Sequence, residues 1–221
     1  MGAGSFEGFS RRALDFYAEV ERENSREWWL AHKPLYEADV RAPITALVGA
    51  LEPDFGVAHV FRPNRDVRVA ADKAPYKTHQ GAYCATADKA YYYVQIDADG
   101  LLVGAGGYRF AADQLGRYRT AVSDDLAGPD LERILSASRA DGLEVGGEQL
   151  KSRPRGVAAD HPRLELLRHK SIHLSRGIGD PDWVFGPEAL PRIRAEWERL
   201  RAFTGWLDQH VGATEIDDRF S

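Results

Sequence analysis

The chain has 221 residues, of which 43% are hydrophobic and 29% charged, and its formal net charge is −5. This composition is that of a globular protein with a substantial core. The negative net charge argues against a protein whose main function is to bind nucleic acid. The single cysteine, Cys84, excludes an internal disulfide framework and any zinc site built on two thiolates. No apolar run reaches membrane-spanning length, so we expect a cytoplasmic protein without a signal peptide or membrane contact.

The first quarter of the chain has a helical pattern. Residues 8–22 place apolar side chains on one helical face, and Ser10 is the expected N-cap. Asn24 is expected to cap a second helix. A third helix should run to about Leu51, where Glu-Pro-Asp-Phe-Gly breaks it, and Pro43 should kink this helix or mark its first turn.

The period then changes to that of strands. Apolar and aromatic residues favour an extended chain at 57–61, 81–87, 91–97 and 101–107. The turns Asp88-Lys89 and Ala98-Asp99-Gly100 have hairpin length. The sequence therefore predicts an antiparallel meander over about residues 81–107.

Helical patterns return after the meander. We expect mid-chain helices at 111–124 and 128–139, a short strand or hairpin within 143–152, a short helix at 162–167, a strand at 171–178 and a long C-terminal helix from Pro187 to about Gln209. Helices, then strands, then helices indicate an α+β fold with a mostly antiparallel sheet.

Two basic stretches interrupt this acidic chain. Residues 62–79 contain five Arg or Lys and two Asp, and residues 151–170 contain six Arg or Lys against two acidic residues. Arg offers a planar fork of donors that matches phosphate or carboxylate, and Lys adds a point charge. Pro63 and Pro75 would let the first stretch fold back on itself, so that several of its cations face one way.

Four segments resemble one family of bacterial and fungal proteins, domain of unknown function 2461. They are Arg65-Asp66-Val67-Arg68-x₃-Asp72-Lys73-x-Pro75-Tyr76-Lys77, Asn24-x-Arg26-x-Trp28-Trp29, Gly104-Ala105-Gly106-x-Tyr108, and Leu150-Lys151-x₂-Pro154-x-Gly156. The resemblance covers nearly the whole chain, so it implies a single domain, residues 1–221. It implies no activity, and function must be argued from the residues.

Our leading hypothesis is a pocket for a small phosphate- or carboxylate-bearing ligand. Its candidate ligand-binding residues are Arg65, Arg68, Lys73 and Lys77, with Lys151 and Arg153 opposite. If the protein is an enzyme, Asp66 or Asp72 is the candidate base and Tyr76 or His79 the candidate acid, in a phosphoryl or acyl-type hydrolysis. Arg155 and Arg163 are expected to be solvated loop residues.

Two alternatives remain open. Asp66 and Asp72 are natural partners for the Arg residues of their own stretch, so the motif can equally be an internal ion-pair network that only stabilises the fold. The two basic stretches can also serve a nucleic-acid-binding protein, which would bind with a steep dependence on salt. The oligomeric state is left open.

Other motifs favour structural roles. Gly104 to Gly107 could present amides to a phosphate, but Arg109 replaces the third glycine of the dinucleotide fingerprint, so close backbone packing is the better reading. The histidines at 79, 161, 169 and 173 follow no metal-ligand spacing, and we expect no metal and no cofactor. Cys84 lies in an expected strand and should be a core residue.

Overall fold

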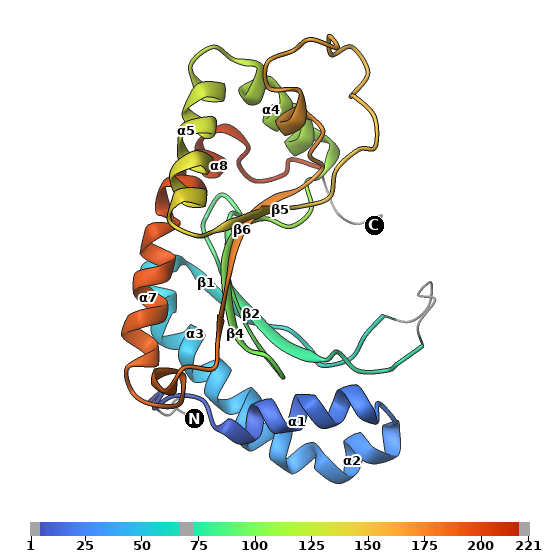
Figure 1. Ribbon diagram of the computed structural model, residues 1–221, viewed down its shortest axis with the longest axis vertical. Helices are drawn as coiled ribbons and strands as arrows, with labels where there is room; N and C mark the ends of the chain where they lie inside the picture. The colour runs from blue at the N-terminus through green and yellow to red at the C-terminus, as the bar shows by residue number, and fades with distance from the viewer. Residues whose placement is uncertain (1–4, 67–72, 217–221) are drawn as a thin grey trace. The chain divides into compact units, whose positions relative to one another are not determined.

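The computed structural model describes residues 5–66 and 73–216. An antiparallel sheet has the strand order β1-β2-β3-β4-β6-β5, and helices precede and follow its central meander (Figure 1). This confirms the predicted α+β class. The chain divides into two compact units, of which unit 1 is Met1–Cys84, Tyr93–Val103 and Gly177–Glu196, and unit 2 is Ala85–Tyr92, Gly104–Arg176 and Trp197–Ser221. The single domain expected over residues 1–221 stays a prediction.

The elements follow one another much as the sequence pattern indicates. The strands are β1 (Val57–Val60), β2 (His79–Ala85), β3 (Tyr91–Asp97), β4 (Gly100–Gly107), β5 (Glu144–Gly146) and β6 (Ile172–Gly179). The helices are α1 (Arg11–Arg22), α2 (Arg26–Leu35), α3 (Ala42–Phe55), α4 (Ala112–Ser123), α5 (Ala127–Ala140), α6 (Leu164–Leu167), α7 (Ala189–Arg199) and α8 (Arg201–His210), with a π-helical segment η1 (Tyr36–Arg41) and a 3-10 turn η2 (Asp182–Phe185).

The helix starts confirm two predictions and correct one. Ser10 caps α1, its hydroxyl accepting from the amide of Arg12, and Pro43 lies in the first turn of α3, where its missing N–H is tolerated. The predicted Asn24 cap of α2 is wrong. Ser25 caps that helix, its Oγ accepting from the amide of Trp28 at 3.1 Å.

The predicted end of this helix near Leu51 is one turn too early, because α3 continues to Phe55 and ends within the predicted breaking segment at Gly56. Phe55 is 2% exposed and lies four residues after the buried Leu51, so one more helical turn buries another large aromatic ring. The helix ends at Gly56, which has a φ of 98° and whose amide donates to the carbonyl of Glu52 at 3.0 Å.

The expected C-terminal helix is present and is interrupted at Leu200, where α7 gives way to α8. The amide of Leu200 donates to the carbonyl of Trp197 at 3.1 Å, and the amide of Phe203 donates to Leu200 at 3.0 Å. These i to i−3 bonds tighten the chain for one turn. Trp197, Leu200 and Phe203 are all buried, as the apolar pattern predicts.

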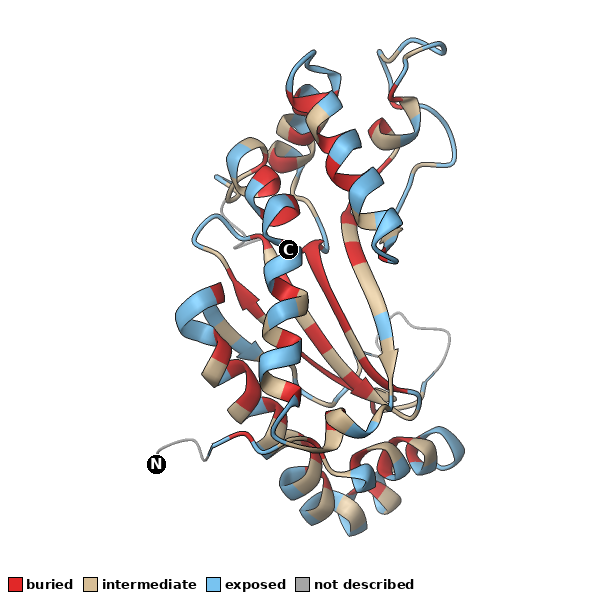
Figure 2. Cartoon of the chain, turned by 60° about the vertical axis from the view of Figure 1, so that its left-hand side comes forward, coloured by how far each residue is buried: buried red, intermediate tan, exposed pale blue. Residues whose placement is uncertain are grey.

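In unit 1 the sheet has one covered face and one half-open face. Ala82 and Cys84 are buried, and the Cys84 thiol lies 3.7 Å from the carbonyl of Val48 in α3. His79 and Tyr83, on alternate positions of the same strand, are half-buried. Figure 2 shows this alternation as buried and intermediate bands along the strands. Because side chains alternate along a strand, α3 covers one face and leaves the odd-numbered residues of β2 on the other.

The glycines of β4 allow close strand packing in unit 2. A Cβ on Gly104 would stand 2.5 Å from the carbonyl oxygen of Leu174, and one on Gly106 would stand 2.4 Å from that of Ile172. Gly106 also has a φ of 151°, which L side chains rarely adopt. These glycines therefore accommodate β6, as the structural reading of the motif predicts.

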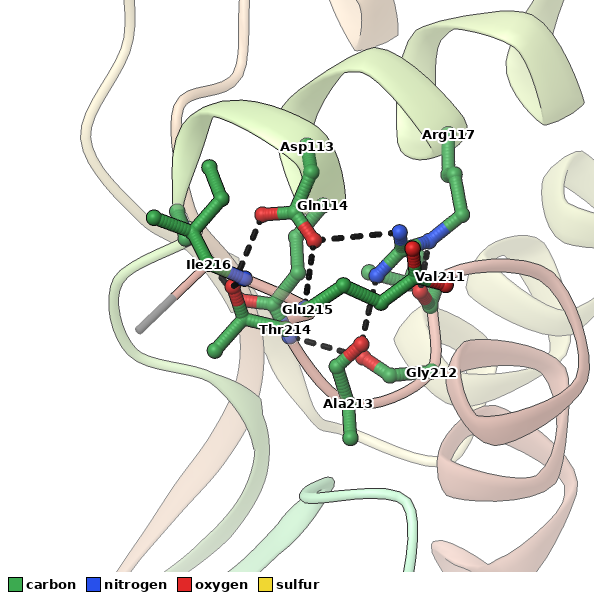
Figure 3. A network of polar contacts seen from close by, with 10 residues as sticks. Asp113, Gln114, Arg117, Val211, Gly212, Ala213, Thr214, Glu215 and Ile216 are labelled. Atoms are coloured by element: carbon green, nitrogen blue, oxygen red, sulfur yellow. Dashed lines mark hydrogen bonds and ion pairs between the residues drawn. The ribbon is translucent and has the colours of Figure 1, made fainter. Parts of the chain in front are cut away.

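The segment after α8 is tied to α4 within unit 2 (Figure 3). The Arg117 guanidinium donates to the carbonyls of Val211 at 2.5 Å and Ala213 at 2.6 Å, and the Gln114 amide donates to the carbonyl of Gly212 at 2.7 Å. Three consecutive backbone carbonyls thus find donors on one helix, which fixes the path of the chain after α8.

Asp113 completes this attachment from the same helix (Figure 3). Its carboxylate accepts from the Thr214 hydroxyl at 2.8 Å and the Glu215 amide at 2.9 Å, and it pairs with Arg117 at 3.1 Å. These contacts, led by the Glu215 amide, lower the pKa of Asp113 to about 2. A charged carboxylate is therefore part of the folded arrangement of the C-terminal segment.

Candidate functional site

The central basic stretch folds back on itself, as Pro63 and Pro75 predict. The amide of Arg65 donates to the carbonyl of Pro75 at 2.9 Å, and the amide of Lys77 donates to the carbonyl of Pro63 at 2.8 Å. The resulting pair of antiparallel arms is called below the two-armed loop, residues 61–66 and 73–78.

The predicted charged residues of this loop fall into two groups. Arg68 and Asp72 lie outside the described residues, so their roles as ligand-binding residue and base stay predictions. Arg65 is half-buried, and Asp66 and Lys73 are exposed. The pairing of the arms places Arg65 and Lys73 in one loop with Lys77, while their individual roles also stay predictions.

Asn24 locks the two-armed loop to the N-terminal helices. Its side-chain nitrogen donates to the carbonyl of Tyr76 at 3.0 Å, and its side-chain oxygen accepts from the amide of Tyr76 at 3.1 Å. The Tyr76 ring stacks on Trp29, with centroids 4.0 Å apart and planes 7° apart, and Tyr76 is only 8% exposed. The structure therefore shows a packing role for Tyr76, and its role as an acid stays a prediction.

A buried amide fixes the other end of the loop. Gln80 is 1% exposed, and its side-chain oxygen accepts from the Tyr36 hydroxyl at 2.7 Å. Its side-chain nitrogen donates to the carbonyls of Phe61 and Gly81, both at 2.8 Å. A buried amide whose polar atoms are all hydrogen-bonded holds its partners in one arrangement. Gln80 therefore fixes the position of the Phe61 backbone.

Lys77 has an unusual set of partners for a half-buried ammonium group. Its Nζ donates to the carbonyl of Arg62 at 3.1 Å and lies 4.9 Å from the ring centroid of Phe61. Burial lowers the pKa of Lys77, and the charge of Arg62 lowers it further. Within the described part of the chain, no carboxylate lies within ion-pair distance of this ammonium.

His79 begins β2, two residues after Lys77. Burial lowers the pKa of its imidazole, and the charge of Lys77 acts in the same direction, while Asp97 acts against them. Its ring is therefore neutral at pH 7, the form that accepts a proton. The role of His79 as an acid stays a prediction.

Aromatic rings cover the half-open face of the strands next to Lys77. This cluster, called below the aromatic face, consists of His59, Phe61, Tyr83 and Tyr93. His59 stacks on Tyr83 at 5.0 Å, and Phe61 lies 5.3 Å from Tyr83 and 6.4 Å from Tyr93, between ring centroids. Sequence reasoning did not single out these rings. Their odd-numbered alternation along neighbouring strands is the signal that would have found them.

A row of polar side chains continues this face along β3. The Tyr93 hydroxyl donates to the Gln95 oxygen at 2.8 Å, and the Gln95 nitrogen donates to Asp97 at 2.7 Å. Gly81 makes room for the row, because a Cβ there would lie 2.4 Å from the Tyr93 hydroxyl. The three side chains at every second residue therefore form one connected polar edge.

The remaining predicted ligand-binding residues lie in unit 2. Lys151 and Arg153 are exposed, and Arg168 anchors their loop by donating to the carbonyl of Leu150 at 2.9 Å. A pocket formed jointly with the two-armed loop stays a prediction. Arg163 corrects an expectation, since it is buried and donates to the carbonyl of Val122 at 2.6 Å.

Three other features bear on function within the described residues, namely the grouping of metal-ligating side chains, the length and polarity of the helices, and the Cys84 thiol. Residues 5–66 and 73–216 contain no group of three or more His, Cys, Asp or Glu side chains arranged to hold a metal ion. In the same part of the chain, every helix is too short or too polar to span a bilayer. The thiol of Cys84 is buried and its pKa is raised to about 12, so it is a core residue as expected.

Comparison with known proteins leaves the activity open and settles the family. No curated protein matches the sequence. The family model described as conserved hypothetical protein (DUF2461) matches residues 12–206. That span contains the Asn24 clamp, the two-armed loop, the aromatic face and the glycines of β4. The chain therefore belongs to the DUF2461 family.

Proposed function

We propose that this protein binds a small anionic ligand, bearing a phosphate or carboxylate group, at the two-armed loop, and that it does so in the cytoplasm. The observation that carries the proposal is the position of Lys77. Its ammonium lies between the carbonyl of Arg62 and the ring of Phe61, next to the charge of Arg62. Neither of these contacts neutralises the charge.

Two neighbouring cations raise each other's free energy, and partial burial increases this effect because solvent screens them less. A bound anion would relieve the repulsion, and the depressed pKa of Lys77 would rise toward its ordinary value. Arg65 and Lys73 belong to the same loop and are further candidate ligand-binding residues, and Arg68, outside the described residues, is a third candidate from the sequence. An Arg fork among them would add paired hydrogen bonds to a phosphate or carboxylate.

An enzymatic extension places phosphoryl or acyl-type hydrolysis at this site. The candidate bases are Asp66 and Asp72. Tyr76 and His79 are the candidate acids, and His79 begins β2 two residues after Lys77. Lys77 and the Arg residues would stabilise the negative charge that develops in the transition state.

Ligand-dependent thermal stability tests the binding proposal. Inorganic phosphate, pyrophosphate and citrate are added to the wild type and to the Lys77→Met and Lys33→Met variants at constant ionic strength. Lys33 is an exposed lysine of α2 and serves as the matched control. An anion at a hundredfold excess over its Kd adds about 2.7 kcal/mol, which raises the Tm by several degrees in a chain of this size.

We expect this rise in the wild type and in Lys33→Met, and a much smaller rise in Lys77→Met. The proposal is wrong if none of the anions raises the Tm of the wild type. It is equally wrong if Lys77→Met responds as strongly as the wild type does.

Nucleic-acid binding is the second candidate, favoured by the basic loop of unit 2. Lys151, Arg153 and Arg155 are exposed, and none is ion-paired with a carboxylate within the described ranges. Electrophoretic mobility shift with a mixed single-stranded oligonucleotide at about 50 mM salt tests it. A shift that weakens steeply with added salt and is lost in Lys151→Ala/Arg153→Ala supports this function, and no shift at this low salt concentration excludes it.

A further inference from the structure

We infer that the ligand of the two-armed loop carries a planar heteroaromatic ring beside its anionic group, as a nucleoside 5′-phosphate does. This inference rests on the proposed anion site. It adds that the ring of the ligand stacks on the aromatic face while the phosphate pairs with Lys77.

Phe61 lies next to both parts of this site, the Lys77 ammonium and the other rings of the aromatic face. Its ring centroid lies 4.9 Å from the Lys77 ammonium, 5.3 Å from the ring centroid of Tyr83 and 6.4 Å from that of Tyr93. The cation and both neighbouring rings therefore lie around the same Phe61 side chain. A ligand whose ring and anionic group are held a sugar apart can reach both parts.

Part of the aromatic face is exposed to solvent. His59 is exposed, and Phe61, Tyr83 and Tyr93 are half-buried even though they lie next to one another. Val57, two residues before His59 on the same face of β1, is 68% exposed. Leaving ring surface in contact with water forgoes the stabilisation of full burial, so a flat apolar partner would bind here favourably.

The polar row along β3 supplies contacts for the edge of such a ring. The Gln95 nitrogen donates one hydrogen to Asp97 and retains a second, and the Asp97 carboxylate retains lone pairs after accepting from Gln95 and from the Asp99 amide at 2.9 Å. Nucleobases carry donors and acceptors on the edge of a planar ring, which a sugar phosphate without a base does not offer. The combination of cation, stacked rings and polar edge favours a nucleotide over a simple phosphate ester.

Isothermal titration with three matched probes tests the inference. AMP carries ring and phosphate, ribose 5-phosphate carries only the phosphate, and adenosine carries only the ring. Each is titrated into the wild type and into Tyr83→Leu, His59→Ala, Lys77→Met and Tyr108→Leu. Tyr108 is 85% exposed in unit 2 and controls for the loss of a tyrosine.

The expected pattern separates the two contributions. AMP should bind about tenfold more tightly than ribose 5-phosphate, since a base stacked on an aromatic side chain contributes that much or more. Tyr83→Leu should weaken AMP by about tenfold and leave ribose 5-phosphate unchanged. Lys77→Met should weaken both phosphates. His59→Ala, an exposed substitution that leaves the core intact, should weaken AMP alone and so guards against misfolding of Tyr83→Leu.

Each contrary outcome has its own meaning. Equal binding of AMP and ribose 5-phosphate, insensitive to Tyr83→Leu and His59→Ala, overturns the stacking inference and leaves the proposed anion site standing. Adenosine binding as tightly as AMP overturns the anion site itself. A single-stranded oligonucleotide that binds more than about ten times more tightly than AMP at the same salt concentration identifies the occupant as nucleic acid and overturns the mononucleotide assignment.

Discussion

Asn24 clamps the backbone of Tyr76 with both atoms of its side-chain amide, donating to the carbonyl at 3.0 Å and accepting from the amide at 3.1 Å. The two residues are far apart in sequence, and each belongs to a segment that resembles the family pattern. The clamp joins these two segments physically, because one supplies the partner for the backbone of the other.

Removing the clamp should lower stability. Asn24→Ala leaves the backbone amide and carbonyl of Tyr76 without their protein partners, and we expect a loss of about 1–3 kcal/mol in the free energy of unfolding. Urea unfolding followed by circular dichroism measures it. Asn64→Ala is the matched control, because Asn64 is exposed in the same loop. An equal effect of the two substitutions would show that the clamp contributes nothing.

The glycines of β4 should tolerate no side chain. Gly106→Ala places a Cβ 2.4 Å from the carbonyl of Ile172 at a φ of 151°, so the strands must separate. We expect a loss of more than about 2 kcal/mol of stability or failure to fold. Gly116→Ala is the control within α4, where a Cβ meets nothing within 4 Å. It should stabilise the helix by about 0.5–1 kcal/mol. Comparable stability of the two variants would contradict the packing role of Gly106.

The attachment of the C-terminal segment should depend on pH through Asp113. Hydrogen bonds from the Glu215 amide and its neighbours hold the pKa of Asp113 at about 2, below the value of an unfolded aspartate. A lowered pKa in the folded state contributes stability that is present above the unfolded pKa and is lost as pH falls through the folded pKa. The contribution should therefore disappear between about pH 4 and pH 2.

Chemical unfolding at a series of pH values from about 5 to about 2 measures this loss. Asp113→Asn should be less stable than the wild type at the upper end of this range, and the difference should shrink toward the lower end. Asp125→Asn removes an exposed carboxylate and should keep the pH dependence of the wild type. A wild type whose stability falls in parallel with that of Asp113→Asn would refute the role of Asp113.

Cys84 should be unreactive in the folded protein. Burial raises the pKa of its thiol to about 12, so almost no thiolate exists at mildly alkaline pH, and the side chain is fully buried. A reference thiol is introduced by Ser152→Cys, since Ser152 is exposed in a loop. We expect a maleimide to label Cys84 at least about a hundredfold more slowly than this reference thiol. Mass spectrometry follows both rates in the one double-cysteine protein. Rapid labelling of Cys84 without denaturant would place it outside the core.

Local sequence patterns predicted correctly those features of secondary structure that depend on neighbouring residues alone. The Ser10 cap, the Pro43 first turn and the alternating strands follow from short-range sterics and from the spacing of apolar residues. Asn24 and Ser25 show where this reasoning stops. Both residues can cap a helix, and the distant backbone of Tyr76 takes up the amide of Asn24, which leaves Ser25 to cap α2.

The candidate site likewise has features that the sequence predicts and features that depend on tertiary packing. The sequence by itself determined the α+β class, the order of the elements and the concentration of cations in the central stretch, because composition and periodicity are local properties. Only the tertiary structure decided which strand face stays half-open, since that depends on where α3 packs. It therefore also decided that Lys77 lies over Phe61, next to rings from strands that are remote in sequence.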